Sequence, residues 1–254
     1  MQMFGYGNIM PVYACLHLFT SPAGKPTTAA IRPRSLASIS LDAIVPAFGV
    51  GYFTLSCLYA YPFSSASLHQ WLGALWQGFP HHVVGWQYIF TKLLSGRSYT
   101  APPEARSWSR DYRALSAVYD FAFNVGAAAQ LSVYAILAAV ALAPGLFSKS
   151  LLDSLTVREV FFPGHFHSHR KMNSMGAAMH TMLLYDQYAG SAAALVWAVT
   201  LYITSRKQSM AFGDVARLSW DVARWTFVAG PAGALVRLLQ RRDHNLLMDE
   251  QKRA

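Results

Sequence analysis

The stretch MGAAMHTMLLYDQYAGSAAALVWAVTLYIT, from Met175 to Thr204, decides the fold class. It is apolar almost throughout, it contains no Lys or Arg, and Asp186 is its single acidic residue. A helix that crosses a bilayer needs about 20 mostly apolar residues. We therefore predict a transmembrane helix over this range.

Further apolar stretches of similar length precede this one. They run from Phe4 to Thr20, from Ala43 to Tyr61, from Leu68 to Phe90 and from Ala114 to Phe147. Helix is the expected state because a backbone in hydrocarbon must satisfy its own hydrogen bonds, and the alternating pattern of a membrane barrel is absent. The last stretch is longer than one crossing needs, which predicts tilt, an interfacial extension or a break near Gly126.

The segment from Ala211 to Leu239 has a mixed character. Four charged residues lie in its first half, and its apolar second half is interrupted by Gly230-Pro231 and Arg237. This pattern predicts either a helix that lies in the membrane interface or a weaker sixth crossing.

Composition supports the same class of protein. The chain has 254 residues, of which 54% are hydrophobic and 13% charged. The charged fraction is about half that of a soluble domain, and the positive mean hydropathy excludes disorder as the reason. We predict an all-α fold, a multi-pass integral membrane bundle of five to seven transmembrane helices. Residues 1–254 are expected to form a single domain with a basic C-terminal tail at 240–254.

The net charge is +9, which in a soluble chain would suggest nucleic acid as a partner. Nearly all Lys and Arg residues fall in connections or in the tail, as Lys25, Arg32 and Arg113 do. That distribution is typical of the positive-inside rule. The expected partner is therefore a lipid bilayer and not a nucleic acid, in the endoplasmic reticulum or another endomembrane.

The two cysteines, Cys15 and Cys57, both lie in apolar stretches. Their separation matches neither a Cys-x-x-Cys motif nor a zinc site, so we expect them to be packing residues. No internal repeat is present, and an inverted-repeat transporter therefore gains no support.

Acidic residues inside apolar spans are costly and by default indicate function. The chain has two such candidates, Asp186 and Asp120. A carboxyl in an apolar pocket can stay protonated near neutral pH and donate its proton. Ala193 and Trp197 fall on the helical face of Asp186, so this face suits a flat apolar ligand. The alternative is a close-packed helix crossing built from small residues. For Asp120, the alternative is a structural polar contact between helices.

Histidines form the densest polar cluster of the sequence. His165, His167 and His169 alternate along one segment and could together bind a transition metal, but no neighbouring acid or cysteine completes a ligand set. Exposed loop histidines are the alternative, and we predict no metal site. The chain also lacks the aspartate-rich motifs of magnesium-dependent diphosphate ionisation and the Gly-x-Ser-x-Gly elbow of serine hydrolases.

Three stretches resemble a known family. FGYGNIMPVY at Phe4 to Tyr13, WQGFP at Trp76 to Pro80 and YDQYAGSAAALVWA at Tyr185 to Ala198 are similar to the fungal membrane-bound terpene cyclases of the ascofuranone-cyclase type. The resemblance implies cyclisation of a prenyl chain, often a terminal epoxide, by protonation in meroterpenoid or terpenoid biosynthesis. It also implies that no metal or other cofactor is needed. Family members usually carry further spans ahead of the first stretch, so this chain is expected to be a shortened form.

The predicted function is a proton-initiated, metal-independent terpene cyclase of the isomerase or lyase type that acts on a hydrophobic isoprenoid substrate. The predicted catalytic acid is Asp186, with Asp120 as second choice. The matching stretches and the aromatic face supply the predicted substrate-binding residues, which are Tyr6, Asn8, Tyr13, His17, Trp76, Gln77 and Trp197. Two alternatives stay open. One is a non-catalytic membrane carrier or scaffold for a lipophilic intermediate, and the other is a metal- or haem-dependent oxidoreductase that uses the histidines.

Overall fold

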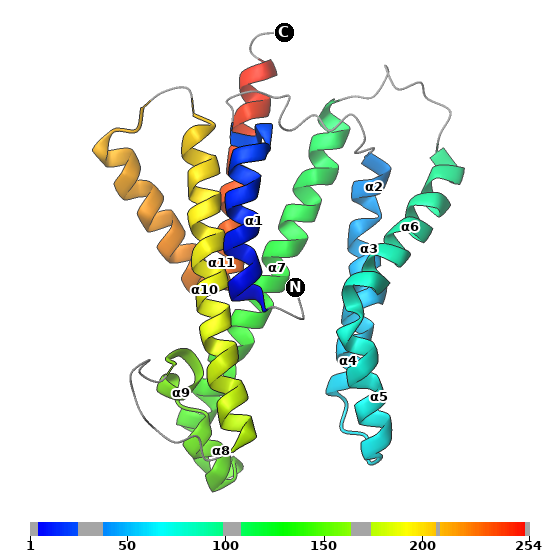
Figure 1. The fold of residues 1–254 in the computed structure, drawn as a ribbon, viewed down its shortest axis with the longest axis vertical. Helices are drawn as coiled ribbons and strands as arrows, with labels where there is room; N and C mark the ends of the chain where they lie inside the picture. Colours follow the sequence, from blue (N-terminus) through cyan, green and yellow to red (C-terminus); the bar gives the residue numbers. More distant parts are fainter. Residues whose placement is uncertain (1–4, 25–37, 99–107, 164–173, 207–208, 252–254) are drawn as a thin grey trace. The chain divides into compact units, whose positions relative to one another are not determined.

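The computed structural model describes residues 5–24, 38–98, 108–163, 174–206 and 209–251 (Figure 1). Every regular element in these residues is a helix, which confirms the predicted all-α class. The chain divides into two compact units. The first contains residues 1–31 and 122–254, the second contains residues 32–121, and each is described by itself.

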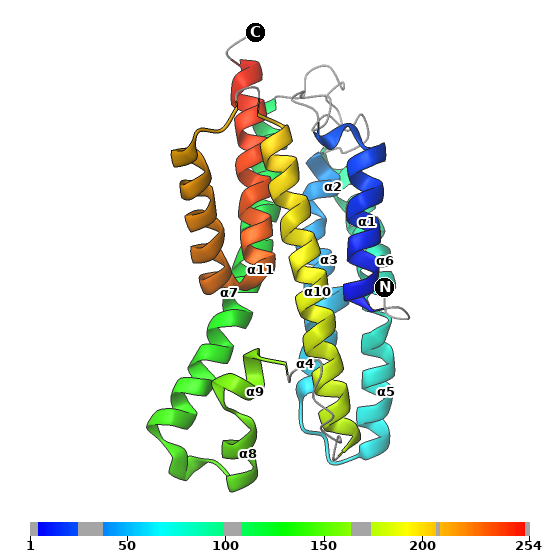
Figure 2. The same ribbon diagram turned by 60° about the vertical axis from the view of Figure 1, so that its left-hand side comes forward.

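The first unit is built around two helices that lie side by side in Figures 1 and 2, α1 and α10. The elements wholly within it are α1 (Tyr6–Thr20), η1 (Pro22–Gly24), η5 (Pro144–Leu146), α8 (Lys149–Ser154), α9 (Val157–Phe161), α10 (Met175–Thr204) and α11 (Phe212–Gln251). The bounds of α10 confirm the predicted helix, whereas its crossing of a membrane stays a prediction because α10 is not one of the candidate spans. Ser174 sets its start, because the Ser174 hydroxyl accepts a hydrogen bond from the backbone N–H of Ala177 at 3.1 Å.

The helix α11 reverses direction at Gly230. Ala229 and Gly230 leave the helical region, and Gly230 has a φ of 68°. A first arm at 212–228 and a second arm at 231–251 therefore fold back on each other, as Figure 2 shows. Leu218 of the first arm and Leu238 of the second share one apolar core. The segment from Ala211 to Leu239 is therefore not one continuous helix, because Gly230 permits a positive φ and Pro231 cannot continue a helical hydrogen-bond ladder. Its place in the interface or across the membrane stays a prediction.

The long helix α7 (Trp108–Leu142) belongs to both units and runs without the break expected near Gly126. Gly126 instead lies where α7 packs against the turn of α11. A Cβ at this position would lie 2.9 Å from the backbone oxygen of Ala229, so glycine lets α7 approach the turn of α11 closely. Next to it, the Tyr134 hydroxyl donates a hydrogen bond to the backbone oxygen of Phe227 at 2.9 Å.

The second unit holds shorter helices and the first part of α7. They are α2 (Ser38–Asp42), α3 (Ile44–Phe48), the π-helix η3 (Gly49–Thr54), α4 (Leu55–Ala60), α5 (Ala66–Gln77) and α6 (Phe79–Ser98). The predicted span from Leu68 to Phe90 is therefore two helices and not one. Gly78 ends α5, and Pro80 lies in the first turn of α6, where a proline needs no N–H partner.

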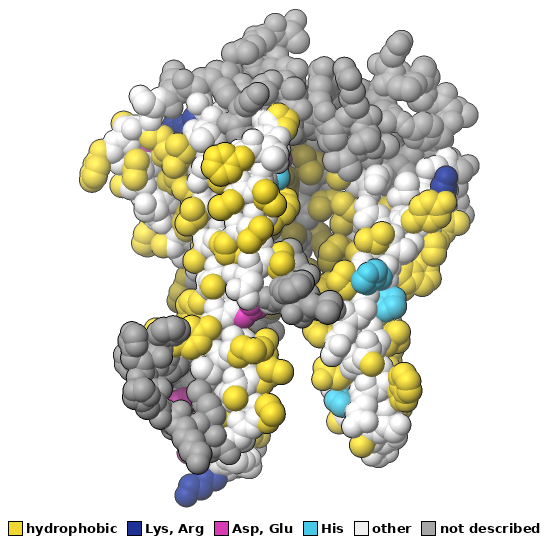
Figure 3. Space-filling view, in the orientation of Figure 1, with side chains coloured by type: hydrophobic (Ala, Val, Ile, Leu, Met, Phe, Trp, Pro, Cys, Tyr) yellow, Lys and Arg dark blue, Asp and Glu magenta, His cyan; other side chains and the backbone are white. Residues whose placement is uncertain are grey.

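Among the residues that the structure describes, two segments are long and apolar enough to cross a membrane, Ser40–Ala60 and Tyr112–Leu142. They give weak support for membrane association, and the expected number of crossings stays a prediction. Figure 3 shows apolar side chains spread over the outer faces of α1 and α10, where Leu16 is 59% exposed and Val196 is 66% exposed. Cys15 and Cys57 are both exposed, so the prediction that they are packing residues is wrong.

Candidate functional site

The carboxylate of Asp186 lies at the N-terminus of α1. Its Oδ2 accepts a hydrogen bond from the backbone N–H of Tyr6 at 2.9 Å, and its Oδ1 accepts one from Gly7 at 2.7 Å. The first N–H groups of a helix have no partner within the helix, and the helix dipole is positive at this end. Asp186 therefore satisfies two of these donors from a helix 180 residues away in sequence.

Glycines make this approach possible. Gly5 has a φ of 75°, and a Cβ there would lie 2.4 Å from Oδ1 of Asp186. A Cβ on Gly7 would lie 2.8 Å from the backbone oxygen of Asp186. Any side chain at either position would displace the carboxylate or α1, so the Gly-x-Gly pattern of Gly5 and Gly7 has a direct structural reason.

The helical face of α10 that carries Asp186 is covered by α1. Met10 and Ala14 of α1 form a buried cluster with Ala194 of α10, and Ala193 and Trp197 pack against it. Of the two interpretations that the sequence allows, this face is the close-packed helix crossing. A ligand would have to lie along the edge of the helix pair and not between the two helices.

One turn from the end of this crossing, three rings meet. Tyr13 and His17 of α1 lie with ring centroids 5.6 Å apart, and the ring of Trp197 is 5.2 Å from His17 and 6.0 Å from Tyr13. The indole Nε1–H of Trp197 donates a hydrogen bond to Nδ1 of His17 at 3.1 Å. The structure therefore brings three of the predicted substrate-binding residues together.

The remaining predicted site residues lie in the first turn of α1 and in the second unit. Tyr6 is half-buried and Asn8 is exposed, both in the first turn of α1. Trp76 and Gln77 lie at the end of α5 in the second unit, where Trp76 donates from Nε1 to the Ser56 hydroxyl at 2.9 Å. The predicted site residues therefore belong to both units, and only those of the first unit can be related to the α1–α10 pair.

The second candidate acid, Asp120, is half-buried on α7. Asp120 is not without an interaction partner, and Asn124 one turn further along is exposed. The structural alternative for Asp120, a polar contact between helices, stays open beside the catalytic one.

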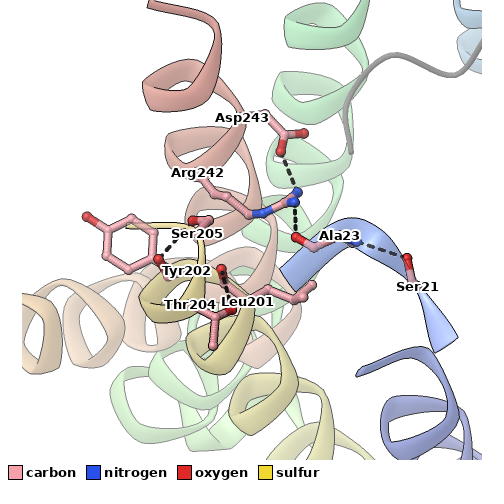
Figure 4. Close-up of polar contacts among 8 residues, drawn as sticks. All are labelled: Ser21, Ala23, Leu201, Tyr202, Thr204, Ser205, Arg242 and Asp243. Atoms are coloured by element: carbon pink, nitrogen blue, oxygen red, sulfur yellow. Dashed lines mark hydrogen bonds and ion pairs between the residues drawn. The ribbon is translucent and has the colours of Figure 1, made fainter. Parts of the chain in front are cut away.

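Sequence reasoning missed a buried charged group at the end of α1. Arg242 and Asp243, which the sequence analysis assigns to the basic tail, are each 6% exposed. The guanidinium of Arg242 donates to Asp243 at 2.7 Å and to the backbone oxygen of Ala23 (Figure 4). Arg242 thereby ties the turn after α1 to the second arm of α11. The one feature of the sequence that could have indicated this burial is the Arg242-Asp243 pair itself, two opposite charges next to each other.

His165, His167 and His169 lie outside the described residues, so the expectation that they form no metal site stays a prediction. In the part of the chain that the structure describes, no three His, Cys, Asp or Glu side chains are grouped closely enough to hold a metal ion.

These observations define a class of protein: the described residues form helices with apolar outer faces, and an acidic side chain lies at a helix–helix crossing. Comparison with family models matches residues 1–247 to the CtvD domain, and the chain therefore belongs to the CtvD domain family. This is a fungal terpene cyclase-like family of biosynthetic enzymes, which supports an enzymatic role in terpenoid or meroterpenoid biosynthesis. The match does not extend to the specific ascofuranone type. No curated protein and no solved structure matched the chain.

Proposed function

We propose that the chain is a membrane-bound terpene cyclase that closes rings on a prenyl chain after transfer of a proton. The observation that carries this proposal is the family match over residues 1–247. The substrate would be a farnesyl-type chain, free or attached to an aromatic group, with a terminal epoxide or alkene. The two membrane-compatible segments, 40–60 and 112–142, fit a multi-pass protein of the endoplasmic reticulum or another endomembrane, where such a substrate dissolves.

Asp186 is the acid that we assign to the first step. A carboxyl group offers about two lone pairs on each oxygen, and the N–H groups of Tyr6 and Gly7 use one on each. A proton can therefore occupy a remaining lone pair while both hydrogen bonds persist. Once that proton has left, the same two N–H groups stabilise the carboxylate that remains. Asp120 is the second candidate for this role.

The proposed reaction conserves all atoms of the substrate. The proton passes from the carboxyl to an epoxide oxygen, whose C–O bond opens, or to one carbon of a terminal C=C bond. The π electrons of the next C=C bond then form the new ring bond and leave a cation further along the chain. Loss of a C–H proton from the last cation to the carboxylate forms a new C=C bond and restores the acid. The product is an isomer of the substrate.

Aromatic faces assist the cationic stage of such a reaction through their quadrupoles, by about 0.5–2 kcal/mol each. Tyr13 is the most accessible ring of the α1–α10 cluster, at 45% exposed. Its place at the edge of the helix pair suits a chain that lies along that edge.

A non-catalytic carrier is the second candidate function, and one observation favours it. An apolar groove of about 370 Å³ lies between the end of α10 and the first arm of α11, with Val199, Leu218 and Val222 among its lining residues. Most of its lining is apolar and none of it is acidic, so the groove can hold a hydrocarbon but cannot protonate it.

Microsomes that contain this protein alone, supplied with a linear prenyl epoxide, discriminate the two functions. A cyclase converts the epoxide into a product of the same mass with a different retention time. A carrier leaves the epoxide unchanged, and that result would refute the proposed reaction. Microsomes from the same host without the protein give the background.

A further inference from the structure

The hydrogen bond between Trp197 and His17 fixes the protonation of the imidazole ring. An indole N–H can donate but cannot accept, so Nδ1 of His17 must carry a lone pair where Trp197 meets it. A neutral imidazole carries its single proton on the other nitrogen. His17 is therefore a neutral ring with an N–H at Nε2.

The orientation of this ring is fixed as well. The Trp197 ring meets it edge to face, at an interplanar angle of 81°, and the Tyr13 ring lies on α1 one turn before it. His17 is half-buried at the edge of the helix pair. No acceptor in the described part of the chain forms a hydrogen bond with its Nε2–H. An oxygen atom of a ligand at the edge of the helix pair can therefore accept this N–H, and Arg242 is the charged group whose field reaches the same ring.

We infer that His17 donates a hydrogen bond from Nε2 to an oxygen atom of the bound substrate, and that Trp197 is the positioning residue that holds His17 in this tautomer. The ligand class is a prenyl compound with a hydroxyl or carbonyl oxygen. This inference rests on the proposed function, because it concerns the substrate of the same helix pair. It also changes the role of Trp197 from direct substrate binding to control of its neighbour.

The spacing along α10 places this oxygen at a defined end of the substrate. Trp197 follows Asp186 by eleven positions, which corresponds to about 16 Å along a helix. The oxygen held by His17 is therefore not the atom that Asp186 protonates. The polar head of the substrate lies at the Tyr13–His17–Trp197 cluster, and the reacting end of the prenyl chain lies near the N-terminus of α1.

Binding of an unreactive pair of ligands tests this inference without turnover. The two probes are a fully saturated farnesyl alcohol and the hydrocarbon that lacks its hydroxyl, each titrated calorimetrically into the purified full chain in detergent. We expect the native protein to bind the alcohol about 2- to 10-fold more tightly, the range of one neutral hydrogen bond. His17→Phe should abolish this preference, and His17→Gln should keep part of it because its amide also donates. Trp197→Phe, which keeps a ring but loses the N–H, should weaken the preference.

Trp220→Phe is the matched control, because Trp220 is 67% exposed on α11, outside the cluster. This variant should bind both probes as the native protein does. Equal binding of the two probes by the native protein would overturn the inference, as would an undiminished preference in His17→Phe. An undiminished preference in Trp197→Phe would overturn the positioning role of Trp197. Because no probe reacts, failure of the cyclase proposal shows in the microsome assay and leaves this result separate.

Discussion

The ring of Tyr6 lies directly over Gly190. A Cβ at residue 190 would be 2.1 Å from Cδ1 of Tyr6 and 2.4 Å from its Cε1, distances that no real contact reaches. The backbone N–H of the same Tyr6 donates to Asp186. The absence of a side chain at residue 190 is therefore what allows the first turn of α1 to reach the acid.

Replacing Gly190 by Ala should destabilise the α1–α10 pair. The added methyl group must push the Tyr6 ring away, and overpacking of this kind costs about 1–3 kcal/mol. We expect a lower midpoint of thermal unfolding in detergent. Gly176→Ala is the control on the same helix, because a Cβ there would meet only the Ser174 hydroxyl at 3.8 Å. Equal midpoints for the two variants would show that the Tyr6–Gly190 contact does not constrain the fold.

The reversal of α11 should depend on Gly230. Its φ of 68° and ψ of 176° lie in a region that is essentially restricted to glycine, where an L-residue with a Cβ costs about 1–3 kcal/mol. Gly230→Ala should therefore lower the free energy of unfolding by about this amount. Gly213→Ala, where a Cβ would enter open space within the same helix, should not destabilise the protein. Unfolding of both variants can be compared by circular dichroism, and a Gly230→Ala variant as stable as the native chain would contradict the described turn.

Much of the fold could be predicted from apolar run length. The bounds predicted for α10 were confirmed, because a long apolar run without breakers specifies its own helix. The division at Gly78 was missed because Pro80 was placed inside a span and not at a helix start. The reversal at Gly230 was missed because a Gly-Pro pair in an apolar run can mean either a kink or a complete turn.

Less of the candidate site could be predicted from the sequence. Asp186 could be singled out as an acid in an apolar helix, and Tyr13, His17 and Trp197 as neighbouring aromatics. That the N–H groups of Tyr6 and Gly7 would hold the carboxylate could not be foreseen, because it depends on a tertiary contact and on the positive φ of Gly5. The burial of Arg242 likewise depends on where the second arm of α11 packs.

The two arms of α11 should depend on a buried ion pair. The side chain of Asp221 is 6% exposed, contacts Arg224 at 2.8 Å and pairs with Arg241 across the turn. Loss of one partner of a buried pair can cost about 3–5 kcal/mol, and the partial exposure of both arginines places this site below that range. We expect Asp221→Asn to lower the unfolding midpoint clearly.

Asp214→Asn provides the comparison for this pair. Asp214 is 43% exposed and lies 3.6 Å from Arg206, a geometry that contributes less than about 1 kcal/mol. If Asp221→Asn shifts the midpoint no more than Asp214→Asn does, the two arms do not rely on Asp221.

Membrane integration should follow from the segments at 40–60 and 112–142. Both are apolar enough to stay in the bilayer when surface electrostatic contacts are removed. After alkaline carbonate extraction of microsomes, we expect the full chain in the membrane pellet, together with a resident integral protein. Recovery of the chain in the supernatant, with peripheral proteins, would contradict its assignment to the membrane.

The acid role of Asp186 is tested most directly by the rate of product formation in Asp186→Asn. Asparagine keeps one oxygen to accept an N–H of α1 but has no acidic proton, and loss of a general acid costs about 100- to 10,000-fold in rate. Asp153→Asn, on an exposed residue of α8, should leave the rate unchanged. We predict at least a 100-fold loss in Asp186→Asn, measured on protein whose unfolding transition shows that it is still folded, because the variant also loses one of the two hydrogen bonds to α1. A rate within a few-fold of the native protein would show that another group supplies the proton.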